Sequence, residues 1–236
     1  MDIKILFDSK RSNNKFFIGW GISFFIDNKI LFDTGEKAEP LLHNMRELGI
    51  NIDDIETIVI SHDHFDHTGG LWAILEKKPN MRVYICPNFS QDFKKKAMSL
   101  ECHLIMADSF MEIDNGIYTT GEITGKFGIY KIPEQSLVLK TKKGLTIRTG
   151  CAHPGIINIL EYVNANLNDS PYLVMGGFHL LDEPVKNIVF VVQKFIKLGV
   201  KQVAPSHCTG EDATNIFKAS YGNNFMDIKV GKIINV

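Results

Sequence analysis

The stretch from Ser61 to Gly70 reads SHDHFDHTGG and holds three histidines and two aspartates. The potential ligands among them are His62, His64, Asp66 and His67. They follow the apolar run 58–60, which predicts a strand that ends where the loop begins. Because zinc, iron and manganese accept neutral imidazole and carboxylate ligands, the stretch predicts a metal site. A structural metal or a chance cluster is the alternative, but closed structural zinc sites usually contain cysteine.

Single histidines recur in three later segments, at points where further strands are expected to end. They are His153 in segment 149–155, His179 in segment 176–180 and His207 in segment 205–210. In α/β architecture, loops at the C-terminal ends of strands gather into one crevice. We therefore expect these distant histidines to complete the site that the first loop begins.

The rest of the chain alternates between blocks that favour sheet and blocks that favour helices. The first block predicts strands at 3–7, 20–26, 29–32, 57–60, 82–86 and 102–106, and helices at 40–48, 71–78 and 91–98. The second predicts hairpins within 111–120 and 136–149, helices at 156–165, 184–198 and 211–220, and strands at 172–175, 202–204 and the C-terminus. This order favours two sheets with helices on their outer faces, and a doubly wound sheet is the rival. Segment 121–135, rich in glycine, is interpreted as a long mobile loop, which is either a lid or binding segment or a structureless connection.

Length and charge restrict the class of protein. With 236 residues and 44% hydrophobic content, the chain is expected to form a single domain over residues 1–236. The 26 basic and 27 acidic residues give a net charge of −1, which offers no electrostatic argument for binding nucleic acid or a membrane. A small-molecule substrate is the expected partner, and the oligomeric state is left open.

The cysteines and the first residues indicate a reducing compartment. The cysteines, at 86, 102, 151 and 208, are scattered, and a chain of this size does not need disulfides. The sequence contains neither a secretory signal pattern nor a run of roughly 18 apolar residues. We therefore predict a cytoplasmic protein without disulfide bonds.

The pattern His-x-His-x-Asp-His after an apolar strand, preceded by Phe-Asp-Thr-Gly at 32–35, resembles the metallo-β-lactamase superfamily. Segments 149–156, 176–180 and 206–210 resemble a narrower branch, the 7,8-dihydropterin-6-methyl-4-(β-D-ribofuranosyl)aminobenzene 5'-phosphate synthase-like proteins, often described only as metal-dependent hydrolases. The resemblance covers nearly the whole chain. It implies the α/β metallo-β-lactamase fold, an αββα sandwich of two mixed β-sheets flanked by helices.

The resemblance also implies a set of metal ligands. The first ion would be held by His62, His64 and His153, and the second by Asp66, His67 and His207. Asp33 matches an aspartate that orients ligands from behind. The expected cofactor is a pair of zinc ions, with manganese, iron and magnesium as alternatives. Two adjacent ions can activate a water molecule near neutral pH.

One departure from the family pattern weakens the case for hydrolysis. The superfamily usually supplies a bridging aspartate after the strand predicted at 172–175, whereas this chain has Gly-Gly-Phe-His at 176–179. The second metal is then expected to be bound more weakly, to be more labile, or to be held partly by a bridging hydroxide. The same four residues favour the narrower branch. We interpret His179 as a substrate contact or general acid, with a packing role as the alternative. Cys151 and Cys208 are interpreted as small packing groups.

Two reaction classes and three alternatives follow. The chain is predicted to be a metal-dependent enzyme, with Asp66 and His179 as catalytic residues, that hydrolyses a small ester or phosphoester. The second reaction class, which the resemblance implies, is transfer of a dihydropterin-methyl group with loss of diphosphate. This chemistry tolerates the absence of a bridging aspartate better than hydroxide generation does. A metal-containing ligand-binding or sensory protein without turnover is the alternative from another class. An oxygen-reducing diiron protein is disfavoured by His64, because such relatives carry glutamate there, and a nuclease is disfavoured by the balanced charge.

Overall fold

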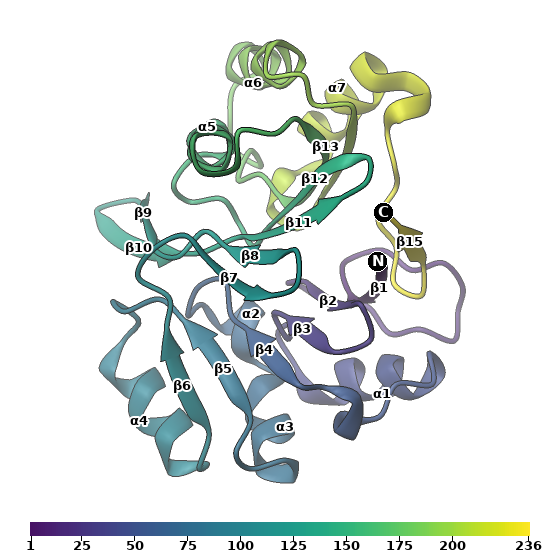
Figure 1. The fold of residues 1–236 in the computed structure, drawn as a ribbon. Helices are drawn as coiled ribbons and strands as arrows, with labels where there is room; N and C mark the ends of the chain where they lie inside the picture. Colours follow the sequence, from purple (N-terminus) through teal and green to yellow (C-terminus); the bar gives the residue numbers. More distant parts are fainter. The chain divides into compact units, whose positions relative to one another are not determined.

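Both ends of the chain contribute to one β-sheet. In the computed structural model, which describes residues 1–236, β15 (Ile233–Asn235) pairs antiparallel with β1 (Asp2–Phe7) (Figure 1). Residues 1–108 and 228–236 form a first unit, and residues 109–227 form a second. That the chain acts as a single domain over residues 1–236 stays a prediction.

The first unit contains a seven-stranded mixed sheet in the order β15-β1-β2-β3-β4-β5-β6. Its other strands are β2 (Ser23–Ile26), β3 (Ile30–Phe32), β4 (Thr57–Val59), β5 (Arg82–Ile85) and β6 (His103–Met106). Strands β15 to β3 are antiparallel, and strands β3 to β6 are parallel. The turn between β2 and β3 has positive φ at Asp27 (50°) and Asn28 (55°), as a tight two-residue hairpin turn requires.

Helices cover this sheet because each has an apolar face. They are α1 (Ala38–Glu47), the short α2 (Phe65–Thr68), α3 (Leu71–Lys77) and α4 (Gln91–Ser99), with a 3₁₀ turn η1 (Ile52–Asp54). Leu41, Ile74 and Phe93, from α1, α3 and α4, belong to the same buried cluster as Leu31 and Ile58 of the sheet. This packing fixes the strand ends from which the first histidine loop extends.

The second unit contains a six-stranded mixed sheet in the order β14-β13-β12-β11-β8-β7. Its strands are β7 (Met111–Asp114), β8 (Ile117–Thr119), β11 (Leu137–Thr141), β12 (Gly144–Thr149), β13 (Pro171–Gly177) and β14 (Gln202–Ser206). Strands β12, β13 and β14 are parallel neighbours, whereas β7, β8, β11 and β12 pair antiparallel. Two mixed sheets replace the doubly wound sheet that sequence order left as a rival.

Three helices pack on the second sheet (Figure 1). They are α5 (Ile156–Leu167), α6 (Val185–Lys197) and α7 (Glu211–Tyr221), and short 3₁₀ turns form η2 (His207–Thr209) and η3 (Gly222–Asn224). Ile159, Phe195 and Phe217 from these helices are buried in one cluster with Ile147 and Val174 of the sheet. The prediction of mixed sheets flanked by helices is confirmed.

The interpretation of segment 121–135 as a mobile loop was wrong. The segment forms a β-hairpin of β9 (Ile123–Phe127) and β10 (Tyr130–Glu134), which is a separate two-stranded sheet. Its glycines suggested a loop, but Gly125 lies inside β9 for a packing reason. A Cβ atom at Gly125 would lie 2.3 Å from the carbonyl carbon of His153, so glycine allows the strand to approach that residue.

Parallel strands place the candidate ligands at their C-terminal ends. In the first unit, Asp33 follows β3 and His62 lies just beyond the neighbouring strand β4. In the second unit, segments 150–153, 178–179 and 207 follow β12, β13 and β14, which are consecutive neighbours. None of the four cysteines forms a disulfide bond. None of the helices has both the length and the apolar character needed to cross a bilayer.

Candidate metal centre

The first unit brings together the four ligands predicted on the loop after β4. His62 and His67 are fully buried, Asp66 is buried, and His64 is partly exposed. The His62 ring centroid lies 4.7 Å from that of His64 and 4.1 Å from that of His67. One ring nitrogen of His62 lies within 4.8 Å of one of His64, so the two imidazoles can share an ion.

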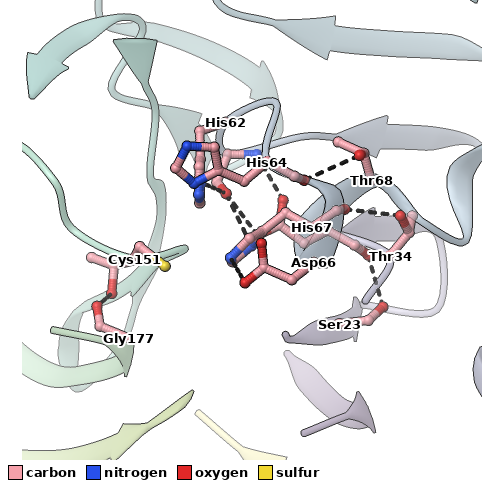
Figure 2. Close-up of polar contacts among 12 residues, drawn as sticks. Ser23, Thr34, His62, His64, Asp66, His67, Thr68, Cys151 and Gly177 are labelled. Atoms are coloured by element: carbon pink, nitrogen blue, oxygen red, sulfur yellow. Dashed lines mark hydrogen bonds and ion pairs between the residues drawn. The ribbon is translucent and has the colours of Figure 1, made fainter. Parts of the chain in front are cut away.

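Asp66 and His67 form a second donor pair in the short helix α2, which follows that loop directly. Figure 2 shows the Asp66 carboxylate beside the His67 ring, and the Oδ2 to Nε2 distance is 3.5 Å. Two ligands of one tetrahedral ion at a bond length near 2.05 Å lie about 3.3 Å apart. The pair therefore has nearly the spacing that a shared ion requires.

Asp33 fixes the orientation of two histidines in this unit. Its Oδ2 accepts a hydrogen bond from Nδ1 of His67 at 2.7 Å and one from the Ser61 hydroxyl at 2.7 Å. Its Oδ1 accepts the Ser61 backbone N–H at 2.7 Å. The Ser61 oxygen in turn lies 2.9 Å from Nδ1 of His62. With Nδ1 held by these partners, Nε2 of each imidazole is the nitrogen available to a metal.

Burial raises the pKa of the Asp33 carboxyl above its ordinary value. The charge and hydrogen bond of His67, and the two hydrogen bonds from Ser61, oppose this shift without cancelling it. A buried carboxylate is costly without a compensating charge. A cation bound through His67 would supply such a charge.

Backbone contacts hold the histidine loop against the start of the chain. Both the N–H and the hydroxyl of Thr34 donate to the carbonyl of His67, each at 2.8 Å, and Figure 2 includes the hydroxyl contact. Gly21 has a φ of +102°, and a Cβ atom there would lie 1.9 Å from the Asp66 carbonyl oxygen. Only glycine both adopts this φ readily and leaves room for the Asp66 carbonyl, so Gly21 allows the ligand loop to pack this closely.

The second unit gathers the three remaining predicted histidines around a cysteine. One ligand atom each from Cys151, His153 and His179 lies within 4.8 Å of the others. The sulfur of Cys151 also lies within 4.8 Å of a ring nitrogen of His207. The rings of His153 and His179 are 4.6 Å apart. His153 and His207 are buried, whereas His179 is partly exposed and accessible to a ligand.

Glu134 is a site residue that the sequence analysis missed. Its buried carboxylate accepts the backbone N–H groups of Cys151, Ala152 and His153 at 2.7–2.9 Å. Its Oε2 also lies 2.8 Å from Nδ1 of His153, which leaves Nε2 of that ring for a metal. Burial raises the pKa of Glu134. The hydrogen bond and charge of His153 and the backbone hydrogen bonds lower it by more, so the pKa lies below its ordinary value. Glu134 ends the hairpin strand β10 and carries no local sequence signal of this role.

The backbone has a strained conformation at or next to several candidate site residues in both units. Asp33, Ala152, His179 and His207 have φ values of 54°, 64°, 54° and 50°. The left-handed region costs a residue with a Cβ atom about 1–2 kcal/mol, and such residues tend to cluster at functional sites. The fold therefore accepts local strain in order to orient these loops.

Cys208 and Phe127 surround the histidines of the second unit. Burial raises the pKa of the Cys208 thiol, but hydrogen bonds to Cys151 and His179 and nearby histidine charges lower it well below its ordinary value. The contact with Cys208 raises the pKa of His179, against the effect of burial. Phe127, half exposed on β9, has its ring 6.0 Å from that of His153 and 5.9 Å from that of His179.

The donor chemistry of both units fits a divalent transition metal. Each unit offers imidazole rings in which one nitrogen already has a hydrogen-bond partner and the other can bind a metal. The partners are Asp33 and Ser61 in the first unit and Glu134 in the second. A carboxylate, Asp66, and a thiol, Cys151, accompany them. Mixed nitrogen, oxygen and sulfur donors suit zinc or iron better than magnesium, which prefers oxygen alone.

Comparisons with known proteins show the family to which the chain belongs. Residues 23–89 match the family profile of the metallo-beta-lactamase superfamily. The chain is 32% identical, over 94% of its length and 92% of the relative, to a 7,8-dihydropterin-6-methyl-4-(β-D-ribofuranosyl)-aminobenzene-5'-phosphate synthase of Methanocaldococcus jannaschii. An uncharacterised protein of that organism is 30% identical over 99% of this chain and 100% of the relative.

A solved structure supports the same assignment. The crystal structure of a metal-dependent hydrolase of the β-lactamase superfamily matches with a TM-score of 0.85 and 31% identity, over 100% of this chain and 99% of that one. The chain belongs to the metallo-β-lactamase superfamily and has its α/β fold. Within the superfamily, it is similar to the synthase-like branch that the sequence motifs indicated.

Proposed function

We propose that this protein is an enzyme that holds two divalent metal ions, zinc in the first instance. His62, His64 and His153 bind the first ion, and the second is bound by the set of Asp66, His67 and His207. These assignments follow the family pattern residue by residue. Membership of a superfamily of metal-dependent hydrolases supports the proposal.

The observation that carries the proposal is the pairing of two ligand imidazoles, His67 and His153, with buried carboxylates. Asp33 holds Nδ1 of His67 at 2.7 Å and Glu134 holds Nδ1 of His153 at 2.8 Å. Metal-binding histidines almost always have such a partner, which fixes the tautomer and raises ligand basicity. A histidine buried only for packing has no need of a buried carboxylate.

The bound ions would act as Lewis acids on a substrate oxygen and would lower the pKa of a coordinated water. The protein's own residues orient the side chains that would hold these ions. Asp33 and Glu134 stay behind the imidazoles and hold them rigid, because both carboxylates are buried. Asp66 adds a negative charge at the site and is proposed as a catalytic residue.

His179 is proposed as the residue that contacts the substrate and donates a proton to its leaving group. It is partly exposed, lies beside His153, and has an aromatic neighbour in Phe127. An imidazole with an ordinary pKa near 6.5 can donate a proton at neutral pH when it lies within hydrogen-bonding reach. Its φ of 54° shows that the backbone has left the extended conformation of β13 at this residue.

The proposed substrate is a small molecule that carries an ester, a phosphoester or a diphosphate. The name of the M. jannaschii relative, a synthase of an aminobenzene phosphate that carries a dihydropterin-methyl group, supports the transfer of such a group. In the proposed reaction, diphosphate is the leaving group. The match to a metal-dependent hydrolase supports hydrolysis instead. Both reactions place negative charge on an oxygen that cations stabilise.

The experiment that tests this proposal measures turnover on a defined panel after metal loading. Protein stripped by a chelator and reloaded with zinc, manganese or iron is assayed with phosphoesters, carboxyl esters, and a dihydropterin-methyl diphosphate with an aminobenzene acceptor. Metal-dependent release of product from one class supports the enzyme and assigns its reaction. Ligand binding without turnover under every metal would favour a sensory protein, which the Gly-Gly-Phe-His sequence at 176–179 also permits.

A further inference from the structure

We propose that the sulfur of Cys151 is a ligand shared by the two metal ions, in place of the bridging carboxylate that this chain lacks. The inference rests on the proposed function, since it takes His153 and His207 as ligands of different ions. It replaces the interpretation of Cys151 as a packing residue. It also gives the two ions an anionic ligand between them.

The position of Cys151 among the donors of the second unit supports a shared ligand. Its sulfur lies within 4.8 Å of a ring nitrogen of His153 and of a ring nitrogen of His207. These two histidines belong to different proposed ion sets. Sulfur and nitrogen ligands of one tetrahedral zinc ion lie about 3.6 Å apart, which falls within that limit. One sulfur is therefore within reach of a ligand of each ion.

The backbone around Cys151 is fixed in the way a ligand loop requires. Its N–H donates to Oε1 of Glu134 at 2.9 Å, and the same carboxylate holds Nδ1 of His153. The residue is 4% exposed, so the sulfur is shielded from solvent. A single buried carboxylate thus orients the cysteine and the histidine together.

Gly177 shows why a carboxylate does not occupy the usual place at the end of β13. Figure 2 shows Cys151 and Gly177 side by side. A Cβ atom at Gly177 would lie 2.4 Å from the carbonyl oxygen of Gly150, 2.6 Å from the sulfur of Cys208 and 3.2 Å from Cα of Cys151. An aspartate cannot enter there without moving the Cys151 loop, whereas the loop itself already provides a donor.

A thiolate in place of a carboxylate leaves the charge of the shared ligand unchanged. On metal binding, the Cys151 thiol loses its proton to solvent and its sulfur supplies electron pairs to the ions, so one negative charge replaces that of a carboxylate. Thiolate is a softer ligand than carboxylate and selects zinc, iron or cobalt over magnesium and manganese. The site is therefore expected to prefer the softer metals.

X-ray absorption at the zinc edge of the loaded protein tests the proposal. The wild type is expected to show a sulfur neighbour at about 2.3 Å from zinc. Cobalt-loaded protein is expected to show a thiolate-to-cobalt charge-transfer band. Cys151→Ser should lose both signals. Cys208→Ser, which changes a second buried cysteine of the same unit, should keep both.

A second variant distinguishes the loss of a metal ligand from misfolding of the protein. Cys151→Asp restores an anionic side chain and is expected to retain more metal than Cys151→Ser while showing no sulfur neighbour. Metal-loaded wild type without a sulfur neighbour, or a signal that is lost only in Cys208→Ser, would overturn the role of Cys151. Wild-type protein that binds no metal at all would instead contradict the proposed function itself.

Discussion

Oδ2 of Asp33 lies 2.7 Å from Nδ1 of His67, and both side chains are fully buried. The two residues are 34 positions apart, so strand pairing between β3 and β4 brings them together. The same carboxylate binds both the backbone and the hydroxyl of Ser61. This contact links the fold of the first unit directly to the orientation of a proposed metal ligand.

Replacing the Asp33 carboxylate should weaken metal binding more than it changes the fold. For Asp33→Asn, we expect a loss of metal affinity of about 10–100-fold, because the outer partner of His67 loses its charge. Competition with a chromophoric chelator measures the affinity. Asp27→Asn removes the same charge from the partly exposed turn after β2, where asparagine tolerates positive φ, and should bind metal like the wild type. Equal affinities for all three proteins would contradict the role of Asp33.

Glu134→Gln should destabilise the second unit, because a carboxylate that accepts four N–H groups is replaced by a side chain with one acceptor oxygen. The expected loss is about 3 kcal/mol of unfolding free energy in metal-free protein, measured by urea denaturation. Glu161→Gln, on the exposed side of α5, should change stability by less than about 0.5 kcal/mol.

Glu134 also predicts the direction of the pH dependence. Its pKa is lower in the folded protein, since the contacts with His153 and the backbone outweigh the effect of burial. Its contribution is therefore present above the ordinary glutamate pKa and is lost as the pH falls through the lowered value. Acid unfolding should become shallower in Glu134→Gln than in the wild type. An unchanged acid profile would show that the contact does not govern acid stability.

His179→Asn should separate catalysis from metal binding. Asparagine tolerates the φ of 54° at this position, so the backbone is preserved while the proton donor is removed. Turnover is expected to fall by about 10²–10⁴-fold with unchanged metal content. The matched substitution His103→Asn, at an exposed position of β6, should leave turnover intact. Full turnover in His179→Asn would exclude the proposed proton transfer.

Tyr221 should make the second unit sensitive to alkali. Burial raises the pKa of its hydroxyl from 10.0 to about 12, and the hydroxyl has no hydrogen-bond partner. The neutral form is favoured in the folded protein, so this stability is complete below pH 10 and is lost as the pH rises through 12. Tyr221→Phe should remove on the order of 2 kcal/mol of this loss, as measured by denaturation at successive pH values. Parallel profiles for the two proteins would contradict the prediction.

The sequence was most informative where ligands are adjacent along the chain. His62, His64, Asp66 and His67 are visible as one cluster, and the structure places them on the loop after β4 and in the short helix α2. The strands and helices that carry the site were also predictable, because their apolar periodicity reflects which side faces the core. Mixed sheets followed from the order of these elements together with the family resemblance.

Contacts over long sequence separations could not be predicted in the same way. Glu134 reaches His153 across 19 residues, and nothing in its neighbours marks it as buried. Its hairpin was read as a loop because glycine usually breaks strands, whereas Gly125 allows close packing on His153. From the sequence, Cys151 is interpreted as a packing group because the neighbouring histidines match the family's ligand positions. Its nearness to His179 and His207 depends on the pairing of three strands.

Elemental analysis of protein purified without chelator tests the central claim most directly. Two ligand sets, each with its imidazoles oriented by the fold, predict two transition-metal ions per chain and metal-dependent turnover after reloading. His67→Ala should reduce the metal content towards one ion per chain, because it removes a ligand from the second set only. One ion per wild-type chain, or none, would contradict the two-metal assignment.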